Sequence, residues 1–219
     1  MVKTIFFDFG GCIDAPGIHT RTLFWEAFRA ENLAQNRAVF QEAYTLADQR
    51  MMSTGEAKEL ALGAFNRHNA ALIAGELKLA NSNAAADRVT ALMRTYLAES
   101  REALLTLQGK FELGVISNFT GNLEVIMREF ALRDFFTTVT ESFYAGASKP
   151  DQKIFRTALA NRKPEDCLYI GDNPVNDIAP AKALGMQAVL IHPPGQKKDC
   201  GADFYAEDLY AFSSWIQKR

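Results

Sequence analysis

The sequence predicts an α/β protein with a doubly wound parallel sheet and an all-helical insertion. Short apolar runs alternate with helical patterns from about residue 111 to the end, which is typical of a parallel sheet covered by helices. Another apolar run stands near the start, and the block from about residue 20 to residue 83 shows helical patterns only. We therefore expect residues 1–14 and 84–219 to form an α/β core domain and residues 15–83 to form an inserted helical domain.

The first predicted strand is the apolar run Ile5–Phe7, which is followed by Asp8. An unbroken apolar run fits a strand that is buried on both faces of a parallel sheet. Asp8 then falls at the carboxyl end of this strand, where open α/β sheets place their chemistry. Gly10 and Gly11 allow the backbone to turn sharply and to approach a ligand closely.

Apolar residues in the helical block recur at helical spacing in four groups, near residues 23–33, 39–47, 60–65 and 72–79. The segments 53–55 and 81–83 are expected to break these helices, because they are rich in serine, asparagine and glycine. No strand pattern occurs between them. The block is therefore predicted to be entirely helical.

The remaining elements alternate. A long helix is predicted from residue 84, and another around residues 104–107. Pro150 is expected in the first turn of a helix, and Gly185 is expected to end the helix that follows Asp172. The predicted strands are 111–116, 136–140, 167–170, 186–191 and a short strand at 204–205, and a closing helix covers 209–216.

Composition narrows the class of protein. The chain has 219 residues, of which 48% are hydrophobic and 23% charged, as in an ordinary soluble globular protein. The formal net charge is -2 and no basic stripe is present, which argues against a nucleic-acid partner. The apolar runs are too short for a membrane span, and no signal peptide precedes the first strand. Cys12, Cys167 and Cys200 fit free thiols of a reducing compartment, so we expect a cytoplasmic protein of undetermined oligomeric state.

Polar side chains follow the predicted strands at one edge of the sheet. They are Asp8, then Ser117 and Asn118, then Ser148 and Lys149, then Asp172, Asn176 and Asp177. Such a set suits phosphoryl transfer. A carboxylate can attack phosphorus and carry the phosphoryl group, and a hydroxyl at a helix N-terminus can bind a phosphate oxygen. An ammonium group neutralises charge on the transferring group, and carboxylates bind Mg²⁺.

These segments resemble the four motifs of the haloacid dehalogenase superfamily. They read Phe-Phe-Asp-Phe-Gly-Gly, Gly-Val-Ile-Ser-Asn-Phe, Ser-Lys-Pro-Asp and Gly-Asp-Asn-Pro-Val-Asn-Asp, in this order along the whole chain. The branch is subfamily I, whose helical C1 cap is inserted after the first motif into a Rossmann-like core. The resemblance implies that the cap closes over the site and selects a small phosphorylated metabolite as substrate.

The resemblance also implies roles for individual residues. Asp8 would be the nucleophile, and Mg²⁺ would be held by Asp8, the backbone carbonyl of Gly10 and Asp172. Ser117, Asn118 and Lys149 would bind the substrate phosphate, and Asp177 would orient Lys149 or a metal-bound water. Asp8, Lys149 and Asp177 are therefore the expected catalytic set.

Two positions depart from the family pattern. Phosphatases of the family usually carry a second aspartate two residues after the nucleophile, where this chain has Gly10, and the usual threonine two residues later is Cys12. Loss of a general acid and base costs roughly 10²–10⁴ in rate. Asp14 and His19 follow closely, and either is a hypothetical replacement proton donor.

Three functions remain open at this point. The first is a Mg²⁺-dependent phosphatase that forms an aspartyl-phosphate intermediate. The second is a 2-haloacid dehalogenase, a class that resembles a pattern with serine in place of Asp172 and needs no metal. The third is a catalytically weak protein that binds a phosphorylated ligand. Asp172 favours phosphate chemistry, whereas Gly10 is compatible with all three.

Overall fold

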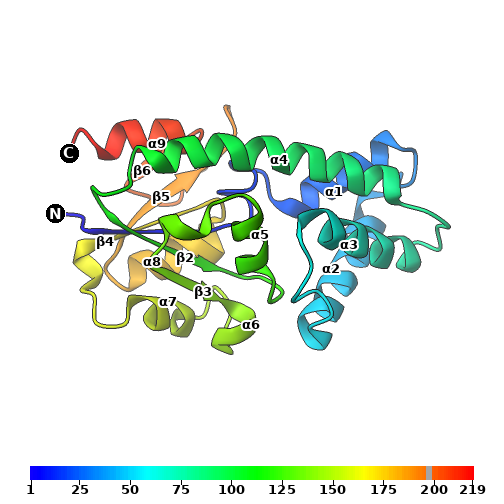
Figure 1. Cartoon of the computed structure of the whole chain (residues 1–219), viewed down its shortest axis with the longest axis horizontal. Coiled ribbons are helices and arrows are strands. Elements are labelled where there is room, and N and C mark those ends of the chain that lie inside the picture. The colour runs from blue at the N-terminus through cyan, green and yellow to red at the C-terminus, as the bar shows by residue number, and fades with distance from the viewer. Residues whose placement is uncertain (196–198) are drawn as a thin grey trace.

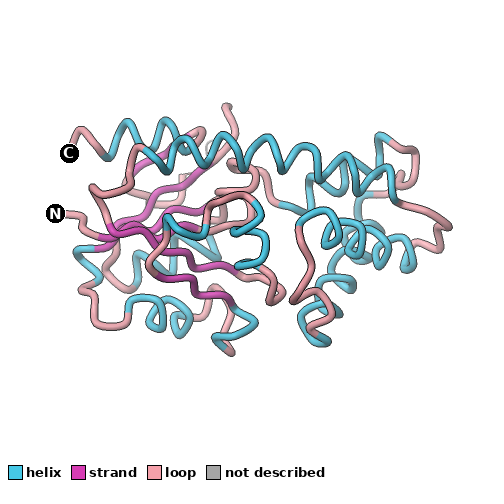
Figure 2. Tube along the Cα trace, viewed as in Figure 1, coloured by secondary structure: helices cyan, strands magenta, loops and turns pink. Residues whose placement is uncertain are grey.

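The computed structural model describes residues 1–195 and 199–219, and its six described strands form one parallel sheet in the order β3-β2-β1-β4-β5-β6 (Figures 1 and 2). This order confirms the predicted doubly wound α/β core. The strands are β1 (Thr4–Phe7), β2 (Glu112–Ser117), β3 (Thr138–Glu141), β4 (Cys167–Gly171), β5 (Gln187–Ile191) and β6 (Phe204–Ala206).

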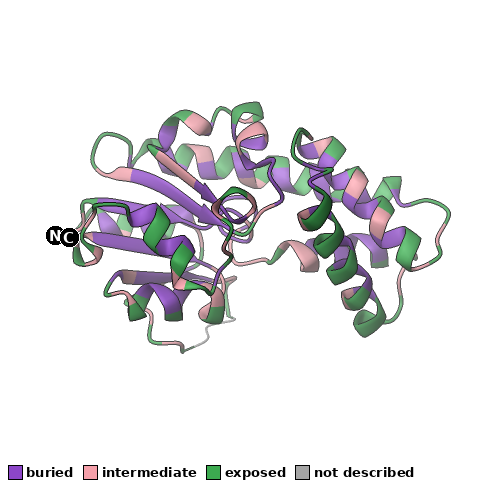
Figure 3. Ribbon diagram, turned by 90° about the horizontal axis from the view of Figure 1, so that it is seen from below, coloured by how far each residue is buried: buried purple, intermediate pink, exposed green. Residues whose placement is uncertain are grey.

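β1 lies at the centre of the sheet. Phe7 is in register with Val115 of β2 on one side and with Ile170 of β4 on the other. All four β1 residues are buried, and the strands form the interior that Figure 3 colours purple. The strand order changes direction beside β1, and open α/β sheets form their binding crevice at such a switch point. The residue that follows Phe7 therefore lies at this crevice.

Helices cover both faces of the sheet. On one face, apolar residues of α7 (Gln152–Leu159) and α8 (Ala179–Ala183) pack against Phe6 and Tyr169. On the other face, α4 (Asn83–Leu105), α5 (Leu123–Glu129) and α9 (Leu209–Ile216) pack against Ile5 and Phe7. The alternation follows from the side-chain period of two along a strand.

The helical insertion lies beside the sheet and not over either face (Figure 1). It contains α1 (Thr20–Ala30), α2 (Arg37–Thr54) and α3 (Leu62–Glu76), together with the first turns of α4, and we call this group the cap. α4 packs against α1 and α3 in the cap and against α9 in the core. The chain positions that divide cap from core, residues 14/15 and 83/84, stay a prediction, because α4 belongs to both groups.

Two of the predicted helix boundaries are wrong. The groups near residues 60–65 and 72–79 share the single helix α3, and the helices predicted from residue 84 and around 104–107 are the single helix α4. Neither glycine nor proline interrupts residues 83–105, so the helix continues. Near the C-terminal end of α4, Ser100 donates a hydrogen bond to the carbonyl of Ile13 at 2.7 Å.

The remaining differences are local. Pro150 precedes its helix and does not lie in the first turn, because Asp151 caps α7 by accepting a hydrogen bond from the amide of Lys153 at 2.8 Å. β3 starts at Thr138 because a turn of 3-10 helix covers Arg133–Phe135. Among the described residues, no helix is long and apolar enough to cross a membrane.

Candidate active site

Asp8 lies directly after β1 with 6% of its surface exposed. Its Oδ1 accepts hydrogen bonds from the amide of Phe9 and the hydroxyl of Ser117, both at 2.8 Å, and its Oδ2 is 2.8 Å from Nζ of Lys149. Burial raises the pKa of Asp8 to about 6, although the Lys149 charge opposes this shift. The carboxylate is thus held in a fixed orientation by three partners.

Lys149 connects Asp8 to the fourth segment. Its Nζ lies 2.7 Å from Oδ1 of Asp177 and 3.0 Å from the hydroxyl of Tyr169. Burial alone would lower the pKa of Lys149, but Asp177 and Asp8 outweigh it and hold that pKa above its usual value. Lys149 is therefore a permanent buried cation that two carboxylates share.

Asn118 fixes the backbone of Lys149. Its side-chain amide donates to the carbonyl of Lys149 at 3.0 Å and accepts from the amide of Lys149 at 2.8 Å. Ser117, predicted at a helix N-terminus, instead ends β2, since the next helix starts at Leu123. The five residues between them form a loop, so the helix N-terminus argument for Ser117 is wrong.

Asp172 follows β4 and is half-buried in the same crevice. No hydrogen bond or ion pair reaches its carboxylate from residues 1–195 or 199–219. Burial and the charges of Asp8 and Asp177 raise its pKa to about 8. Gly11 is required beside it, because a Cβ at this positive φ of 76° would lie 2.5 Å from the Asp172 carboxylate.

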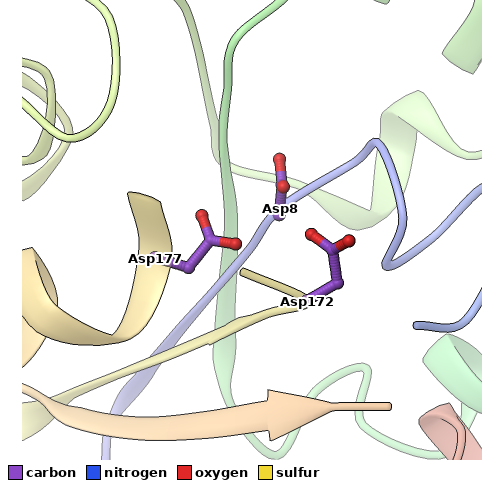
Figure 4. A group of neighbouring side chains, drawn as sticks. All are labelled: Asp8, Asp172 and Asp177. Carbon is purple, nitrogen blue, oxygen red and sulfur yellow. The ribbon is translucent and has the colours of Figure 1, made fainter. Parts of the chain in front are cut away.

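Asp8, Asp172 and Asp177 converge with one carboxylate oxygen of each lying within 4.8 Å of the others (Figure 4). Three carboxylates face one ammonium group, that of Lys149. Carboxylate oxygens and a surplus of negative charge fit Mg²⁺. The Asp172 carboxylate, which has no partner among the described residues, is available to bind such an ion. Gly10 lines the same cavity, and the use of its carbonyl as a ligand stays a prediction.

Asp177 belongs to one turn of π-helix, Pro174–Ile178, and is completely buried. Its Oδ2 accepts a hydrogen bond from the amide of Asn173 at 2.9 Å while its Oδ1 pairs with Lys149. Gly171 makes room for it, because a Cβ there would lie 2.5 Å from the Asp177 carboxyl group. The structure thus places Asp177 where it can orient Lys149.

A cavity of about 270 Å³ joins this cluster to the cap. Its apolar wall includes Phe65 of the cap, which stacks on Phe119 of the core with ring centroids 5.7 Å apart. Beside it, the amide of Leu62 donates to Glu129 at 2.9 Å. These contacts hold the cap against the core beside the cavity. The polar cap residues of the wall are His19, Thr20, Tyr44, Asp48 and Asn69.

Both hypothetical proton donors line the cavity. Asp14 is buried, accepts a hydrogen bond from the amide of Gly11 at 2.7 Å, and has its pKa raised to about 7 by burial. His19 caps α1, since its Nδ1 accepts from the amide of Arg21 at 3.1 Å. Desolvation and the charge of Arg21 lower the pKa of His19. In a neutral ring, acceptance at Nδ1 places the proton on Nε2.

Sequence reasoning missed three residues of this site. Tyr169 donates its hydroxyl to the carbonyl of Ile116 at 3.0 Å and contacts Lys149, and Tyr44 and Asn69 line the cap side. A tyrosine inside the buried run of β4 was the available signal, because a buried hydroxyl needs a partner. Nothing in the helical periodicity of the cap distinguishes Tyr44 and Asn69 from core residues.

Comparisons with known proteins give a consistent result. A family model for haloacid dehalogenase-like hydrolase matches residues 2–185. The chain is 40% identical over 88 residues to the rhythmically expressed gene 2 protein of Drosophila melanogaster, covering 38% of this chain and 34% of that protein. It is also 40% identical over 103 residues to a glyceraldehyde 3-phosphate phosphatase of Pyrococcus furiosus, covering 43% of this chain and 42% of that protein. These matches therefore span less than half the length of either curated relative.

Solved structures show the same fold. The L-2-haloacid dehalogenase of Xanthobacter autotrophicus superposes with a TM-score of 0.62 over 99% of both chains, at 13% sequence identity. At this identity the likeness concerns the fold alone. It confirms the α/β fold of the chain without indicating the reaction.

Proposed function

The chain belongs to the haloacid dehalogenase-like hydrolase family, and on that premise we propose that it is a Mg²⁺-dependent phosphatase of small phosphorylated metabolites. Asp8 is the nucleophile of this proposal. One carboxylate oxygen attacks phosphorus, the bond from phosphorus to the leaving oxygen breaks, and the alcohol takes a proton. Water then attacks the aspartyl-phosphate, which releases phosphate and restores the Asp8 carboxylate.

The observation that carries the proposal is Asp172. Its carboxylate lies in the crevice beside Asp8 without a partner among the described residues. In its ionised form this carboxylate repels an anionic substrate, whether a phosphate ester or a haloacid, unless a cation is bound beside it. When bound there, Mg²⁺ would supply charge neutralisation for the transferring phosphoryl group. Metal-free haloacid chemistry gives Asp172 no role.

The other residues of the cluster position the reaction. Lys149 offers its ammonium group at 2.8 Å from Asp8, where it can neutralise charge on the phosphoryl oxygens. The Ser117 hydroxyl holds Oδ1 of Asp8 in place at 2.8 Å, and Asp177 holds Lys149. The cap contributes one wall of the cavity, so a bound substrate lies between cap and core.

A relative with a printed substrate supports the same direction. The Pyrococcus furiosus protein is named a glyceraldehyde 3-phosphate phosphatase, and a substrate of that size suits a cavity of about 270 Å³. This volume lies below the usual range for drug-sized ligands. The proposal therefore concerns metabolites of a few carbon atoms.

The test is an assay of phosphate release with Mg²⁺ and with EDTA. The wild-type protein is expected to release phosphate from p-nitrophenyl phosphate in the presence of Mg²⁺ and not in the presence of EDTA. Asp8→Asn is expected to abolish this release. Asp172→Asn should raise the Mg²⁺ concentration needed for half-maximal rate. Asp166→Asn is the matched control, because Asp166 precedes β4 at the opposite edge of the sheet and pairs with Lys3.

Other outcomes would overturn the proposal. Chloride release from 2-chloropropionate that EDTA does not affect would identify a dehalogenase. If no substrate turns over while a phosphate ester still raises the melting temperature, the protein is a binding member of the family. Phosphate release that survives in Asp8→Asn would exclude the nucleophile assigned above.

A further inference from the structure

The segment of residues 55–61 joins α2 to α3 and lies against the core, and we call it the strap. Core side chains hold the main chain at its end. The side-chain amide of Asn122 donates to the carbonyl of Leu60, and the Glu129 carboxylate accepts from the amide of Leu62, both at 2.9 Å. The joined positions lie 62 and 67 residues apart in the chain. These two hydrogen bonds therefore fix the cap relative to the core.

Both core side chains are oriented by other partners. Asn122 is 0% exposed, and its Oδ1 accepts a hydrogen bond from the Thr120 hydroxyl at 2.9 Å. Glu129 uses its second carboxylate oxygen to pair with Arg94 of α4 at 3.4 Å. A side chain that is already oriented loses little further freedom when the strap docks, so its hydrogen bond to the strap is stronger in net terms.

Two glycines allow the strap to pack closely on the core. A Cβ at Gly55, where φ is 65°, would lie 2.9 Å from the ring of Phe143. A Cβ at Gly121, where φ is 96°, would lie 3.1 Å from Cβ of Lys58. A side chain at either position would push the two surfaces apart, so the lack of one permits direct contact between strap and core.

The core loop that contacts the strap also positions the nucleophile. This loop covers residues 117–122. Its first residue, Ser117, donates a hydrogen bond to Asp8, and its last residue, Asn122, holds the strap. Between them, Phe119 stacks on Phe65 of the cap with ring centroids 5.7 Å apart. Six consecutive residues thus connect the nucleophile to the cap.

The docked strap sets the position of one wall of the cavity. Neither Asn122 nor Glu129 lines the cavity, whereas Leu62 and Phe65 do. Leu62 is the first residue of α3, and Phe65 lies about one turn further along it. The distance between this apolar wall and a leaving group beside Asp8 therefore depends on the two hydrogen bonds that hold the strap.

We propose that Asn122 and Glu129 are positioning residues for the leaving group, which dock the strap and thereby place Leu62 and Phe65 against the bound ester. The inference rests on the proposed phosphatase function and adds two residues that act on substrate affinity without touching the substrate. The core residues around Asp8 hold the phosphoryl group by themselves. Undocking of the cap should therefore weaken the binding of an ester but not that of inorganic phosphate, because apparent affinity falls with the fraction of protein that is competent to bind.

The test measures two constants for the same variants in the presence of Mg²⁺. They are KM for glycerol 1-phosphate, a three-carbon ester, and the inhibition constant of inorganic phosphate. Asn122→Ala and Glu129→Ala should each raise KM about threefold to tenfold, as expected for the loss of one hydrogen bond. The kcat value should change less than KM, and the inhibition constant of phosphate should stay at the wild-type value.

Two further variants isolate the hydrogen bonds to the strap. Glu129→Gln keeps an acceptor oxygen for the amide of Leu62 and removes only the charge, so its KM should be close to that of the wild type. Glu124→Ala is the matched control on the same helix, because Glu124 pairs with Arg128 and Arg133 of the core. Its KM should be unchanged.

Amide hydrogen exchange tests docking without any turnover. Exchange in residues 55–65 should be faster in Asn122→Ala and Glu129→Ala than in the wild type, whereas β4 and α9 should keep their wild-type rates. Glu129→Ala provides the folded variant where Asn122→Ala loses the fold, because 27% of the Glu129 side chain is exposed.

The outcomes separate this inference from the proposed function. If phosphate is released and KM is the same in the wild type and both alanine variants, the positioning role is refuted and the phosphatase function stands. An equal rise in KM and in the inhibition constant of phosphate would also refute it, because the core site itself would have changed. If no ester is hydrolysed, the phosphatase function fails and exchange decides the docking role, which unchanged rates in residues 55–65 of both alanine variants would refute.

Discussion

Replacement of Gly10 by aspartate is expected to raise the turnover of alkyl phosphates. Gly10 lies two residues after the nucleophile and lines the cavity, where the family places a general acid and base. A Cβ at Gly10 would meet Oγ1 of Thr20 at 3.7 Å, which is an ordinary van der Waals contact. The backbone is not in the left-handed region there, so Gly10→Asp is compatible with the native main chain.

The expected size of the rate increase follows from the proton that the leaving alkoxide needs. A positioned general acid contributes roughly 10²–10⁴ in rate. The new carboxyl group would join Asp8, Asp172 and Asp177, of which only Asp8 and Asp177 pair with Lys149 among the described residues. Their charge would raise the pKa of the new group and keep it protonated, as an acid requires. We therefore expect kcat for glycerol 1-phosphate to rise by about 10² or more in Gly10→Asp.

The assay uses two leaving groups. An alkoxide needs a proton as it leaves, whereas p-nitrophenolate does not, so Gly10→Asp should leave turnover of p-nitrophenyl phosphate nearly unchanged. Gly11→Ala is the steric control. At its φ of 76° the added Cβ would lie 2.5 Å from Asp172, so this variant should lose activity on both substrates.

One result would refute the reasoning. If Gly10→Asp folds and binds Mg²⁺ but leaves alkyl phosphate turnover at the wild-type rate, the proton is already handled by another group. Asp14→Asn and His19→Ala then identify that group, because both side chains line the cavity. If both of these variants also keep full turnover, neither residue donates the proton.

Three further predictions follow from the buried polar groups. Burial and neighbouring carboxylates raise the pKa of Asp172 to about 8, so Mg²⁺ binding at pH 7 should release protons, and the affinity for Mg²⁺ should increase as the pH rises toward 8. Calorimetry in buffers of different ionisation enthalpy measures the number of protons released. Tyr169→Phe should lower the free energy of unfolding in urea by about 1–3 kcal/mol, because it leaves the buried carbonyl of Ile116 without its partner; an unchanged midpoint would contradict this. The pKa of Asp14 is about 7 in the folded protein against an ordinary 3.8, so the folded state retains a proton that the unfolded chain releases. Stability should therefore fall as the pH rises from about 4 to about 7. Asp14→Asn should remove the Asp14 share of this slope, which makes the slope shallower in unfolding measurements made with EDTA.

Much of the core could be predicted from local patterns. β1 is an apolar run that ends at a carboxylate, and β4 is another, so the sequence alone places Asp8 and Asp172 at the same edge of the sheet. Parallel strands bring their carboxyl ends together whatever the details of packing. Strand periodicity and motif order were sufficient for the fold class and the family.

Helix boundaries were less accessible. Whether Leu104 belongs to the helix that starts at Asn83 depends on an uninterrupted backbone and on packing against α9. Likewise, the position of Pro150 outside α7 depends on the cap formed by Asp151. Such ends are decided by competing side-chain hydrogen bonds, which periodicity does not show.

The sequence by itself determined the fold class, the family and the aspartate that opens the site, because strand burial and turn residues act over a few neighbouring positions. Tertiary structure alone decided the pairing of Lys149 with both Asp8 and Asp177, the unpartnered state of Asp172, and the hydrogen bonds that join Asn122 and Glu129 to the cap. Each of these depends on distances between residues far apart in the chain. Packing sets those distances, and the pKa values and free hydrogen-bonding groups follow from them.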